Sequence, residues 1–239
     1  MTAPRDLPTE TPRNLPTETP RNLPSTTGSL PAAGAPRILI VCTGNICRSP
    51  LAEQLLRQNL TAAGIDAIVT SAGTRAMTGS AMTPEAAALS SQYGALRTHH
   101  VARQLTEKLI ADADLVLTAT RDHRRDVVTL LPKATRYTFT LNQFARLVAA
   151  DPAQHPLVEI VGAAPGLPLP TSTTRPPLDF AAYVAEVAST RGLHPSPNPP
   201  TLDDVDDPYR QSAAVYARAA GAINASVTTI TAALVAAGA

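Results

Sequence analysis

The stretch that decides the fold reads RILIVCTGNICRSP and covers residues 37–50. Its first residues are aliphatic and β-branched, which is the pattern of a buried strand. The run ends at Cys42 and passes through a Gly-Asn turn. Ser49 suits a helix N-cap and Pro50 suits the first helical position, so a helix is predicted to begin there. A strand, a turn and a helix in this order place Cys42 and Arg48 where open α/β sheets bind their ligands.

The chemistry of this loop points to an oxyanion ligand. Backbone N–H groups in a tight turn and at a helix N-terminus attract anions, and the planar fork of Arg48 matches two phosphate oxygens. The same positive field favours the thiolate of Cys42, and the Ser49 hydroxyl can donate to that sulfur. Such a thiolate is a nucleophile for phosphorus, so the sequence predicts phosphoryl transfer through a cysteinyl-phosphate. The alternative is a buried structural cysteine beside a surface arginine. The expected phosphate-binding residues are Thr43, Gly44, Asn45, Ile46, Cys47 and Ser49.

The loop CTGNICRS at residues 42–49 resembles the active-site loop of the low-molecular-weight protein tyrosine phosphatases. The segment SAGT at residues 71–74 is a second landmark of that family. The resemblance implies hydrolysis of phosphotyrosine on proteins without a metal or other cofactor. Two adjacent histidines, His99 and His100, could suggest a metal, but metal sites need three or four convergent ligands and no partner segment is evident. No metal site is predicted.

The rest of the chain alternates strand patterns with helix patterns, which predicts an α/β fold. Right-handed crossovers then give an open, four-stranded parallel sheet with helices on both faces. The family resemblance adds the strand order 2-1-3-4, with the Cys42 strand in the centre. Strands are expected at residues 37–42, 66–73, 113–118 and 135–140, and helices at residues 51–63, 83–93, 120–128 and 142–149.

Two segments fall outside this alternation. Residues 1–35 carry an eight-residue repeat in which a lone leucine is flanked by proline and polar residues, so a disordered arm is predicted, with a docking tail as the alternative. Residues 36–239 are expected to form one phosphatase domain. Within it, residues 151–202 are a Pro-rich insertion relative to compact family members, and residues 178–191 show a helical pattern. This insertion could lie over the active-site rim or have no part in the site.

An acid must cross the cleft to protonate the leaving group. The stretch LDDVDDPY at residues 202–209 ends in Asp-Pro-Tyr, which resembles the mobile acid loop of the family. The resemblance implies that Asp207 is the general acid of the first step and the base of the second, and that Tyr209 lines the cleft. Asp206 is the competing candidate. Asp203 and Asp204 are interpreted as a solvated acidic run before a helix.

Bulk composition excludes several classes of function. The formal net charge is +1 and no long basic run occurs, so a nucleic-acid partner is not expected. The chain's two cysteines both lie in the loop, which leaves no disulfide framework, and no signal-peptide pattern opens the sequence, so a cytoplasmic location is expected. The terminal helical pattern, residues 209–239, is rich in alanine, threonine and serine, and is too weakly apolar for stable membrane insertion.

Three rival functions remain open at this point. Arsenate reductases of the same fold use further cysteines, and this chain has none beyond Cys47. Protein arginine phosphatases typically carry threonine where this loop has Ile46. A catalytically silent phosphotyrosine-binding module would not need the intact catalytic set. The expected partner is a phosphotyrosine-containing protein, with a bacterial tyrosine kinase as the specific candidate. The resemblance also implies a reversible disulfide between Cys47 and Cys42.

Overall fold

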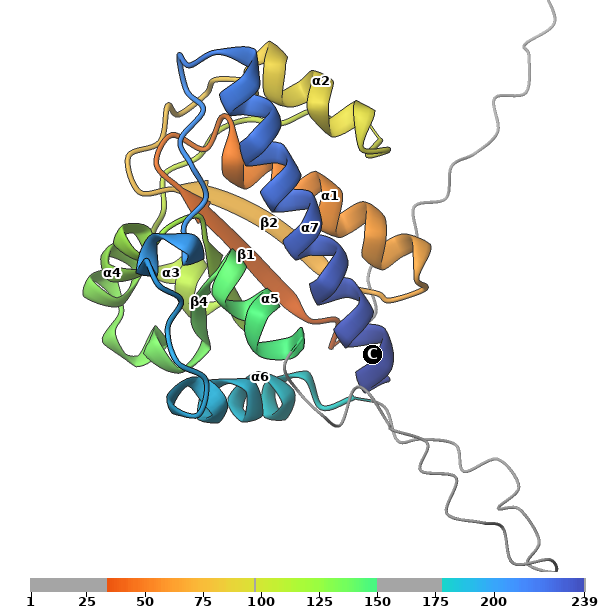
Figure 1. Cartoon of the computed structure of the whole chain (residues 1–239), viewed down its shortest axis with the longest axis vertical. Helices are drawn as coiled ribbons and strands as arrows, with labels where there is room; N and C mark the ends of the chain where they lie inside the picture. Colours follow the sequence, from red (N-terminus) through yellow and green to blue (C-terminus); the bar gives the residue numbers. More distant parts are fainter. Residues whose placement is uncertain (1–33, 97, 150–177, 239) are drawn as a thin grey trace, which may run out of the picture. The chain divides into compact units, whose positions relative to one another are not determined.

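The computed structural model describes residues 34–96, 98–149 and 178–238. The predicted arm lies outside the described residues except at its last two positions, and the Pro-rich insertion lies outside them as far as residue 177. Four parallel strands form one sheet in the order β2-β1-β3-β4, which confirms the predicted topology (Figure 1). The strands are β1 (Arg37–Cys42), β2 (Ile68–Gly73), β3 (Leu115–Thr118) and β4 (Thr138–Thr140).

The strand register brings the chemistry to one edge of the sheet. Cys42, the last residue of β1, is paired with Gly73, the last residue of β2. On the other side of β1, Val41 is paired with Thr118 at the end of β3. Because all four strands are parallel, their carboxyl ends meet at this edge, and Cys42 ends a strand that has a neighbour on each side.

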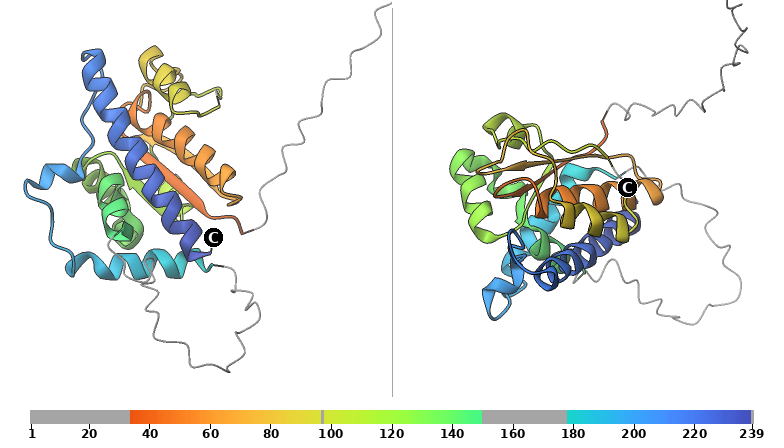
Figure 2. Two further views of the ribbon diagram at one scale, coloured as in Figure 1. Left: turned by 45° about the vertical axis from the view of Figure 1, so that its right-hand side comes forward. Right: turned by 90° about the horizontal axis from the view of Figure 1, so that it is seen from above.

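Helices cover both faces of the sheet, as predicted (Figure 2). Ile38 and Ile40 pack on one face with α1, α5, α6 and α7, whereas Leu39 and Val41 pack on the other with α3 and α4. This alternation follows from the two-residue period of a strand. The short helix α2 packs against α1 and α7. The helices are α1 (Arg48–Ala62), α2 (Pro84–Gln92), α3 (Glu107–Ala111), α4 (Arg121–Leu130), α5 (Leu141–Ala149), α6 (Phe180–Ser189) and α7 (Ala213–Ala237).

Several element boundaries differ from the predictions. Helix α1 begins at Arg48 with Cys47 in the cap position, so Ser49 is not the N-cap and Pro50 is not its first residue. The Ser49 hydroxyl is instead hydrogen-bonded to Cys42 and Asn45 in the preceding loop. Strand β4 is shorter than expected because Pro132–Tyr137 forms a 3-10 helix. Helix α3 follows residues 99–105, which resemble the family stretch that precedes a helix, although its bounds were not predicted. Thr83 and Thr120 do cap α2 and α4, as expected.

Helix α6 confirms the helical pattern of residues 178–191. It packs into the main core, and Arg191 beyond its end donates hydrogen bonds to the carbonyls of Thr135 and Thr138 at 2.8 and 2.7 Å. The Arg191 guanidinium also lies 3.7 Å from the centre of the Phe139 ring. The described part of the insertion therefore covers the outer edge of β4, and none of its residues lines the pocket around Cys42.

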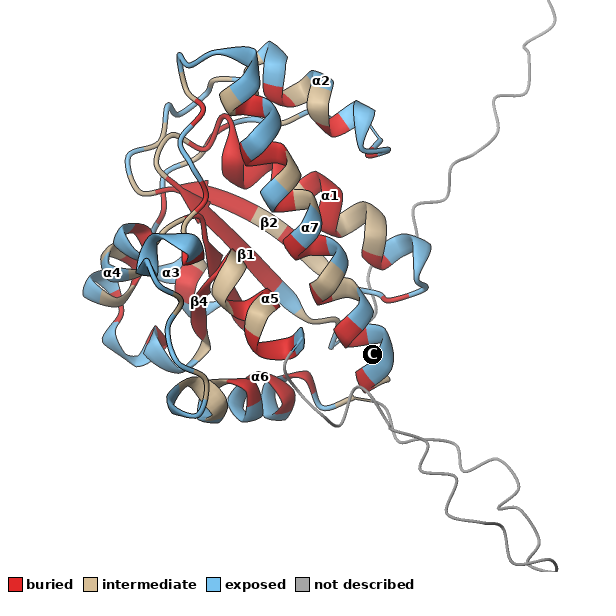
Figure 3. Cartoon of the chain, in the orientation of Figure 1, coloured by how far each residue is buried: buried red, intermediate tan, exposed pale blue. Residues whose placement is uncertain are grey.

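Within the described residues, α7 is the one helix long and apolar enough to cross a membrane. A stripe along α7 is buried against α1 and α5 (Figure 3). Packing of a core helix accounts for this apolar stripe.

Candidate active site

The nucleophile loop, residues 42–49, directs its carbonyl groups toward neighbouring segments of the chain. The carbonyls of residues 42, 43, 44 and 46 accept hydrogen bonds from the backbone N–H groups of residues 74, 75, 77 and 83 at 2.9–3.0 Å. Among the described residues, no N–H of residues 43–47 donates to another backbone group. The first turn of α1 adds N–H groups that have no partner within the helix. The loop is thus an arc of free donors suited to an oxyanion.

Asn45 holds this arc in shape. It is fully buried and its φ of 56° lies in the left-handed region. Its amide nitrogen donates to the hydroxyls of Ser49 and Ser71 at 2.9 and 2.8 Å, and its amide oxygen accepts from the Arg103 N–H at 2.9 Å. His100 Nε2 lies 2.7 Å from the Asn45 carbonyl oxygen. Asn45 therefore supports the loop from behind rather than lining the pocket.

Cys42 lies at the base of the arc. Its Sγ is 3.0 Å from the Ser49 hydroxyl, and both residues are buried. Since Ser49 also accepts a hydrogen bond from Asn45, its own proton is free to be donated to the sulfur. The expected contact between Ser49 and Cys42 is thus present, although Ser49, like Asn45, does not line the pocket.

Gly73 allows β2 to approach the loop closely. A Cβ at this position would lie 2.4 Å from the Thr43 carbonyl oxygen, so no other residue fits without moving the loop. This contact gives a physical reason for glycine in the landmark at residues 71–74.

Arg48 and Asp207 meet across the pocket. The Arg48 side chain is only 6% exposed, and its Nη2 lies 2.8 Å from Asp207 Oδ2. Arg48 also donates to the Val205 carbonyl at 3.2 Å and to the Thr43 hydroxyl at 3.3 Å. Asp206 forms a looser pair with Arg218, at 3.9 Å on the surface, and does not line the pocket. The geometry therefore favours Asp207 over Asp206 as the acid.

The pocket between these groups has a mixed lining. Eight of the ten predicted site residues line it, together with Arg75 and Met77, which were not among the predicted site residues. Tyr209 faces the pocket with the Arg210 guanidinium 5.1 Å from its ring centre. The lining residues are Cys42, Thr43, Gly44, Ile46, Cys47, Arg48, Arg75, Met77, Asp207 and Tyr209.

The chain is similar to known proteins of one family. The sequence model of the family described as "Low molecular weight phosphotyrosine protein phosphatase" matches residues 37–154. The chain is 38% identical over 115 residues to the "Probable low molecular weight protein-tyrosine-phosphatase EpsP" of Ralstonia nicotianae, which covers 48% of this chain and 77% of that relative. This chain belongs to the low molecular weight phosphatase family.

Two further relatives show the breadth of this family. The "Protein-arginine-phosphatase" of Bacillus subtilis is 39% identical over 108 residues, which is 45% of this chain and 71% of the relative. The crystal structure of the Erwinia amylovora tyrosine phosphatase AmsI shares the fold, with a TM-score of 0.54 and 21% identity over 85% of this chain and 93% of that one. Asp207 lies beyond the residues that the family model matches, so its assignment rests on the Asp-Pro-Tyr triplet and on the geometry.

His123 is a residue of this phosphatase site that sequence reasoning missed. It lies in the charged first turns of α4, but its side chain is buried under the nucleophile loop. Its Nε2 lies 2.8 Å from the Thr43 hydroxyl and its Nδ1 lies 2.7 Å from the Thr120 hydroxyl. Burial, and secondarily the charge of Arg48, lowers the pKa of His123 from 6.5 to about 4. His123 is therefore neutral at physiological pH.

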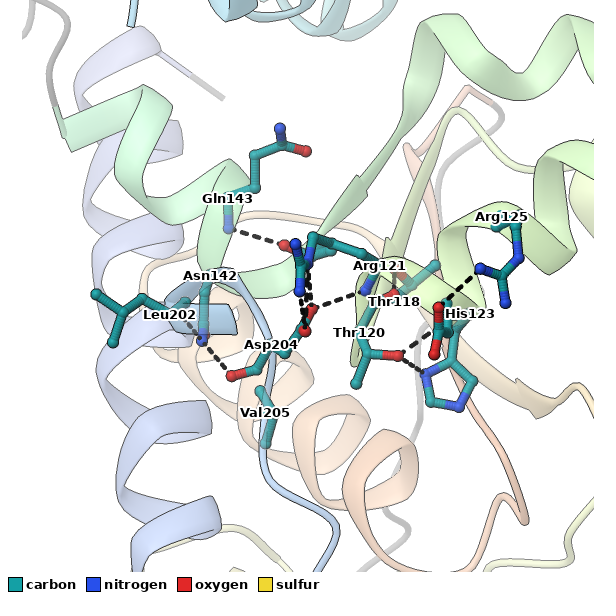
Figure 4. A network of polar contacts seen from close by, with 12 residues as sticks. Thr118, Thr120, Arg121, His123, Arg125, Asn142, Gln143, Leu202, Asp204 and Val205 are labelled. Carbon is teal, nitrogen blue, oxygen red and sulfur yellow. Dashed lines mark hydrogen bonds and ion pairs between the residues drawn. The ribbon is translucent and has the colours of Figure 1, made fainter. Parts of the chain in front are cut away.

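Asp203 and Asp204 are not a solvated run, and that prediction was wrong. The buried Asp203 carboxylate is paired with Arg146 at 3.0 Å. Asp204 is paired with Arg121 at 3.0 Å (Figure 4). The cap of α7 is Ser212 rather than any of these aspartates. Both carboxylates instead fasten the acid loop, residues 203–209, to α4 and α5. No local sequence pattern shows this, because the partner arginines lie more than 50 residues away.

Cys47 lines the pocket and also contacts the cap of α2 and helix α7. Its Sγ lies 3.5 Å from the Thr83 hydroxyl and 3.6 Å from the Tyr216 hydroxyl. Burial raises the pKa of the Cys47 thiol, and burial also raises the pKa of Tyr216 to about 12. Cys42 and Cys47 are both free thiols in the structure. Within the described residues, no group of three His, Cys, Asp or Glu side chains could hold a metal ion.

Proposed function

We propose that this family member is a protein-tyrosine phosphatase that hydrolyses phosphotyrosine through a cysteinyl-phosphate. The observation that carries the proposal is the convergence of Cys42, Arg48 and Asp207 on one pocket whose floor is an arc of unpaired N–H groups. A nucleophile, an oxyanion cradle and an acid within one cleft are the groups that this reaction needs.

The reaction follows from the positions of these groups. The Cys42 thiolate attacks phosphorus, and the bond from phosphorus to the tyrosine oxygen breaks. The carboxyl group of Asp207 gives its proton to the departing phenolate. When a phosphate is bound, two of its oxygens replace the Asp207 carboxylate as hydrogen-bond partners of Arg48. The Asp207 side chain can then take up a proton and act as the acid. In the second step Asp207 takes a proton from water, the water oxygen attacks phosphorus, and the Cys42 thiolate departs with help from Ser49.

The walls of the pocket favour an aryl over a guanidino phosphate. Ile46, Met77 and Tyr209 present apolar or aromatic surface to the group attached to the phosphate. The exposed Arg75 on the same wall would repel a guanidinium group. These contacts support phosphotyrosine as the substrate, even though an arginine phosphatase is among the similar proteins. We further propose a phosphotyrosine-containing protein of the cytoplasm as the partner, with a bacterial tyrosine kinase as the specific candidate.

The first experiment measures turnover of p-nitrophenyl phosphate without added metal. Cys42→Ser should abolish turnover, and Asp207→Ala should lower kcat about 100-fold or more, the usual contribution of a general acid. Asp206→Ala is the matched control, because it removes a neighbouring carboxylate outside the pocket, and it should change kcat less than twofold. A folded wild type that binds phosphotyrosine without turnover would identify a binding module instead.

Substrate choice needs a second comparison. Peptides that carry phosphotyrosine and phosphoarginine at the same position are assayed side by side. A higher kcat/KM for the phosphotyrosine peptide supports the proposal, and a higher value for the phosphoarginine peptide contradicts it. Ile46→Thr should shift the ratio toward phosphoarginine, because it replaces an apolar wall by a hydroxyl.

A redox role for Cys47 is a separate proposal. Peroxide would oxidise Cys42 to the sulfenic acid with release of water, and the Cys47 thiol would then displace a second water to form a disulfide. A thiol reductant would restore both cysteines. Recovery of activity after peroxide treatment should be lower in Cys47→Ser than in the wild type. Equal recovery in the two proteins would show that Cys47 does not protect Cys42.

A further inference from the structure

The catalytic acid has few contacts of its own. The Asp207 side chain is 54% exposed, and its contacts are the Arg48 guanidinium and the N–H of Tyr209. A phosphate on Arg48 would remove the first of these contacts. During the reaction, the position of Asp207 must therefore be set by the backbone of the acid loop and by the contacts that hold this backbone against the rest of the domain.

Asp204 links the acid loop to the neighbouring elements by several hydrogen bonds and an ion pair (Figure 4). Its Oδ1 accepts from the backbone N–H of Arg121 at 2.8 Å, and its two oxygens accept from the Arg121 guanidinium at 3.0–3.3 Å. The Asp204 carbonyl accepts from Asn142 Nδ2 at 3.2 Å. The next residue, Val205, donates its N–H to the Ala119 carbonyl at 2.8 Å.

The segment that contacts Asp204 and Val205 also contacts the nucleophile loop. Residues 119–123 lead from the end of β3 into α4, and within them His123 bonds the Thr43 hydroxyl at 2.8 Å. Thr120 caps α4 and fixes the His123 ring from its other side. One short segment is thus bonded to the loop that carries Cys42 and to the loop that carries Asp207.

We propose that Asp204 is a positioning residue for acid catalysis, and that its pairing with Arg121 sets the place of Asp207 relative to Cys42. The inference rests on the proposed phosphatase reaction. The Arg121 side chain is 46% exposed and the Asp204 side chain is 21% exposed, and an ion pair that solvent reaches contributes little to stability by itself. A forked pair of this kind fixes orientation, and small displacements of a catalytic group lower rates strongly.

The test compares two substrates that differ in their need for an acid. Phenyl phosphate releases a basic phenolate that must be protonated, whereas 2,4-dinitrophenyl phosphate releases a stable anion that leaves without a proton. The parameter is kcat/KM, which reports the formation of the cysteinyl-phosphate. For Asp204→Asn and Arg121→Gln, we expect kcat/KM to fall about tenfold or more with phenyl phosphate and less than twofold with the dinitrophenyl ester.

Arg125→Gln is the matched control, because it breaks an exposed ion pair with Asp122 on the same helix without touching the acid loop. Arg125→Gln should leave kcat/KM unchanged with both esters. Arg121→Gln keeps the backbone N–H bond to Asp204, so it tests the guanidinium even where Asp204→Asn fails to fold. Melting temperatures of all variants are compared.

Two outcomes would overturn the inference alone, and a third would also refute the proposed function. An equal fall of kcat/KM with both esters would show general distortion of the site and overturn the inference. Unchanged values with both esters would overturn it as well, because Asp207 would then be placed without Asp204. A wild type that hydrolyses neither ester would refute the proposed function itself, and the inference with it.

Discussion

The buried His123 makes the stability of this phosphatase depend on pH. Burial and the charge of Arg48 lower its pKa to about 4 in the folded protein, against 6.5 in the unfolded chain. As the pH falls below 6.5, the unfolded chain takes up a proton that the folded protein does not accept until about pH 4. The free energy of unfolding is therefore undiminished above pH 6.5 and decreases as the pH falls from 6.5 to 4.

The size of the effect follows from the two pKa values. A tenfold change in an acid dissociation constant is worth about 1.4 kcal/mol, so the full loss below pH 4 is about 3 kcal/mol. Between pH 7 and pH 5 the same linkage gives a loss of about 2 kcal/mol. That is a large share of the roughly 5–15 kcal/mol that stabilises a typical domain.

Urea denaturation of the wild type and His123→Gln at pH 7 and pH 5 measures this loss. Glutamine does not titrate, so the variant should lose about 2 kcal/mol less than the wild type between the two pH values. His99→Gln, at an exposed position, controls for the removal of a histidine as such. Equal losses in the wild type and His123→Gln would refute the burial of a neutral imidazole under the nucleophile loop.

Three further predictions concern residues around the site and the sheet edge. Gly73→Ala should cost about 1–3 kcal/mol of stability and lower kcat/KM, because its Cβ meets the Thr43 carbonyl, whereas Gly192→Ala, in open space, should be neutral in urea denaturation and in turnover. Arg75→Ala should lower kcat/KM more for phosphotyrosine peptides with acidic neighbours than for those with basic neighbours, since it lines the pocket rim; equal effects on both peptides would exclude it from substrate choice. Arg191→Lys should cost about 1 kcal/mol in urea denaturation, because one ammonium cannot replace a guanidinium that bonds two carbonyls, while kcat/KM stays unchanged.

The sheet and the nucleophile loop could be predicted because their signals are local. A buried strand, a turn and a helix start follow one another within residues 37–50, and that order alone brings Cys42 and Arg48 together. Even there, one local rule failed. Ser49 has the side chain of a good cap, but its hydroxyl is hydrogen-bonded within the loop to Cys42 and Asn45, and the cap position falls at Cys47 instead.

The acid loop shows the opposite case. An Asp-Pro-Tyr triplet points to Asp207, yet sequence alone left Asp206 as a rival and assigned Asp203 and Asp204 to solvent. The structure separates the four carboxylates by their partners, which are Arg146, Arg121, Arg218 and Arg48 in chain order. Identical side chains in one short run thus have four different environments.

The sequence by itself indicated the nucleophile loop and the alternation of strands and helices that predicts a parallel sheet, because these signals lie in residues that are neighbours along the chain. The strand order came from the family resemblance. Only the tertiary structure showed that Asp207 is paired with Arg48, that His123 lies beneath Thr43, and that Asp203 and Asp204 are paired with Arg146 and Arg121. The physical reason is distance along the chain. Thr43 and His123 are 80 positions apart, and Arg121 and Asp204 are 83 apart, so no local pattern encodes their contact until the sheet brings the strand ends together.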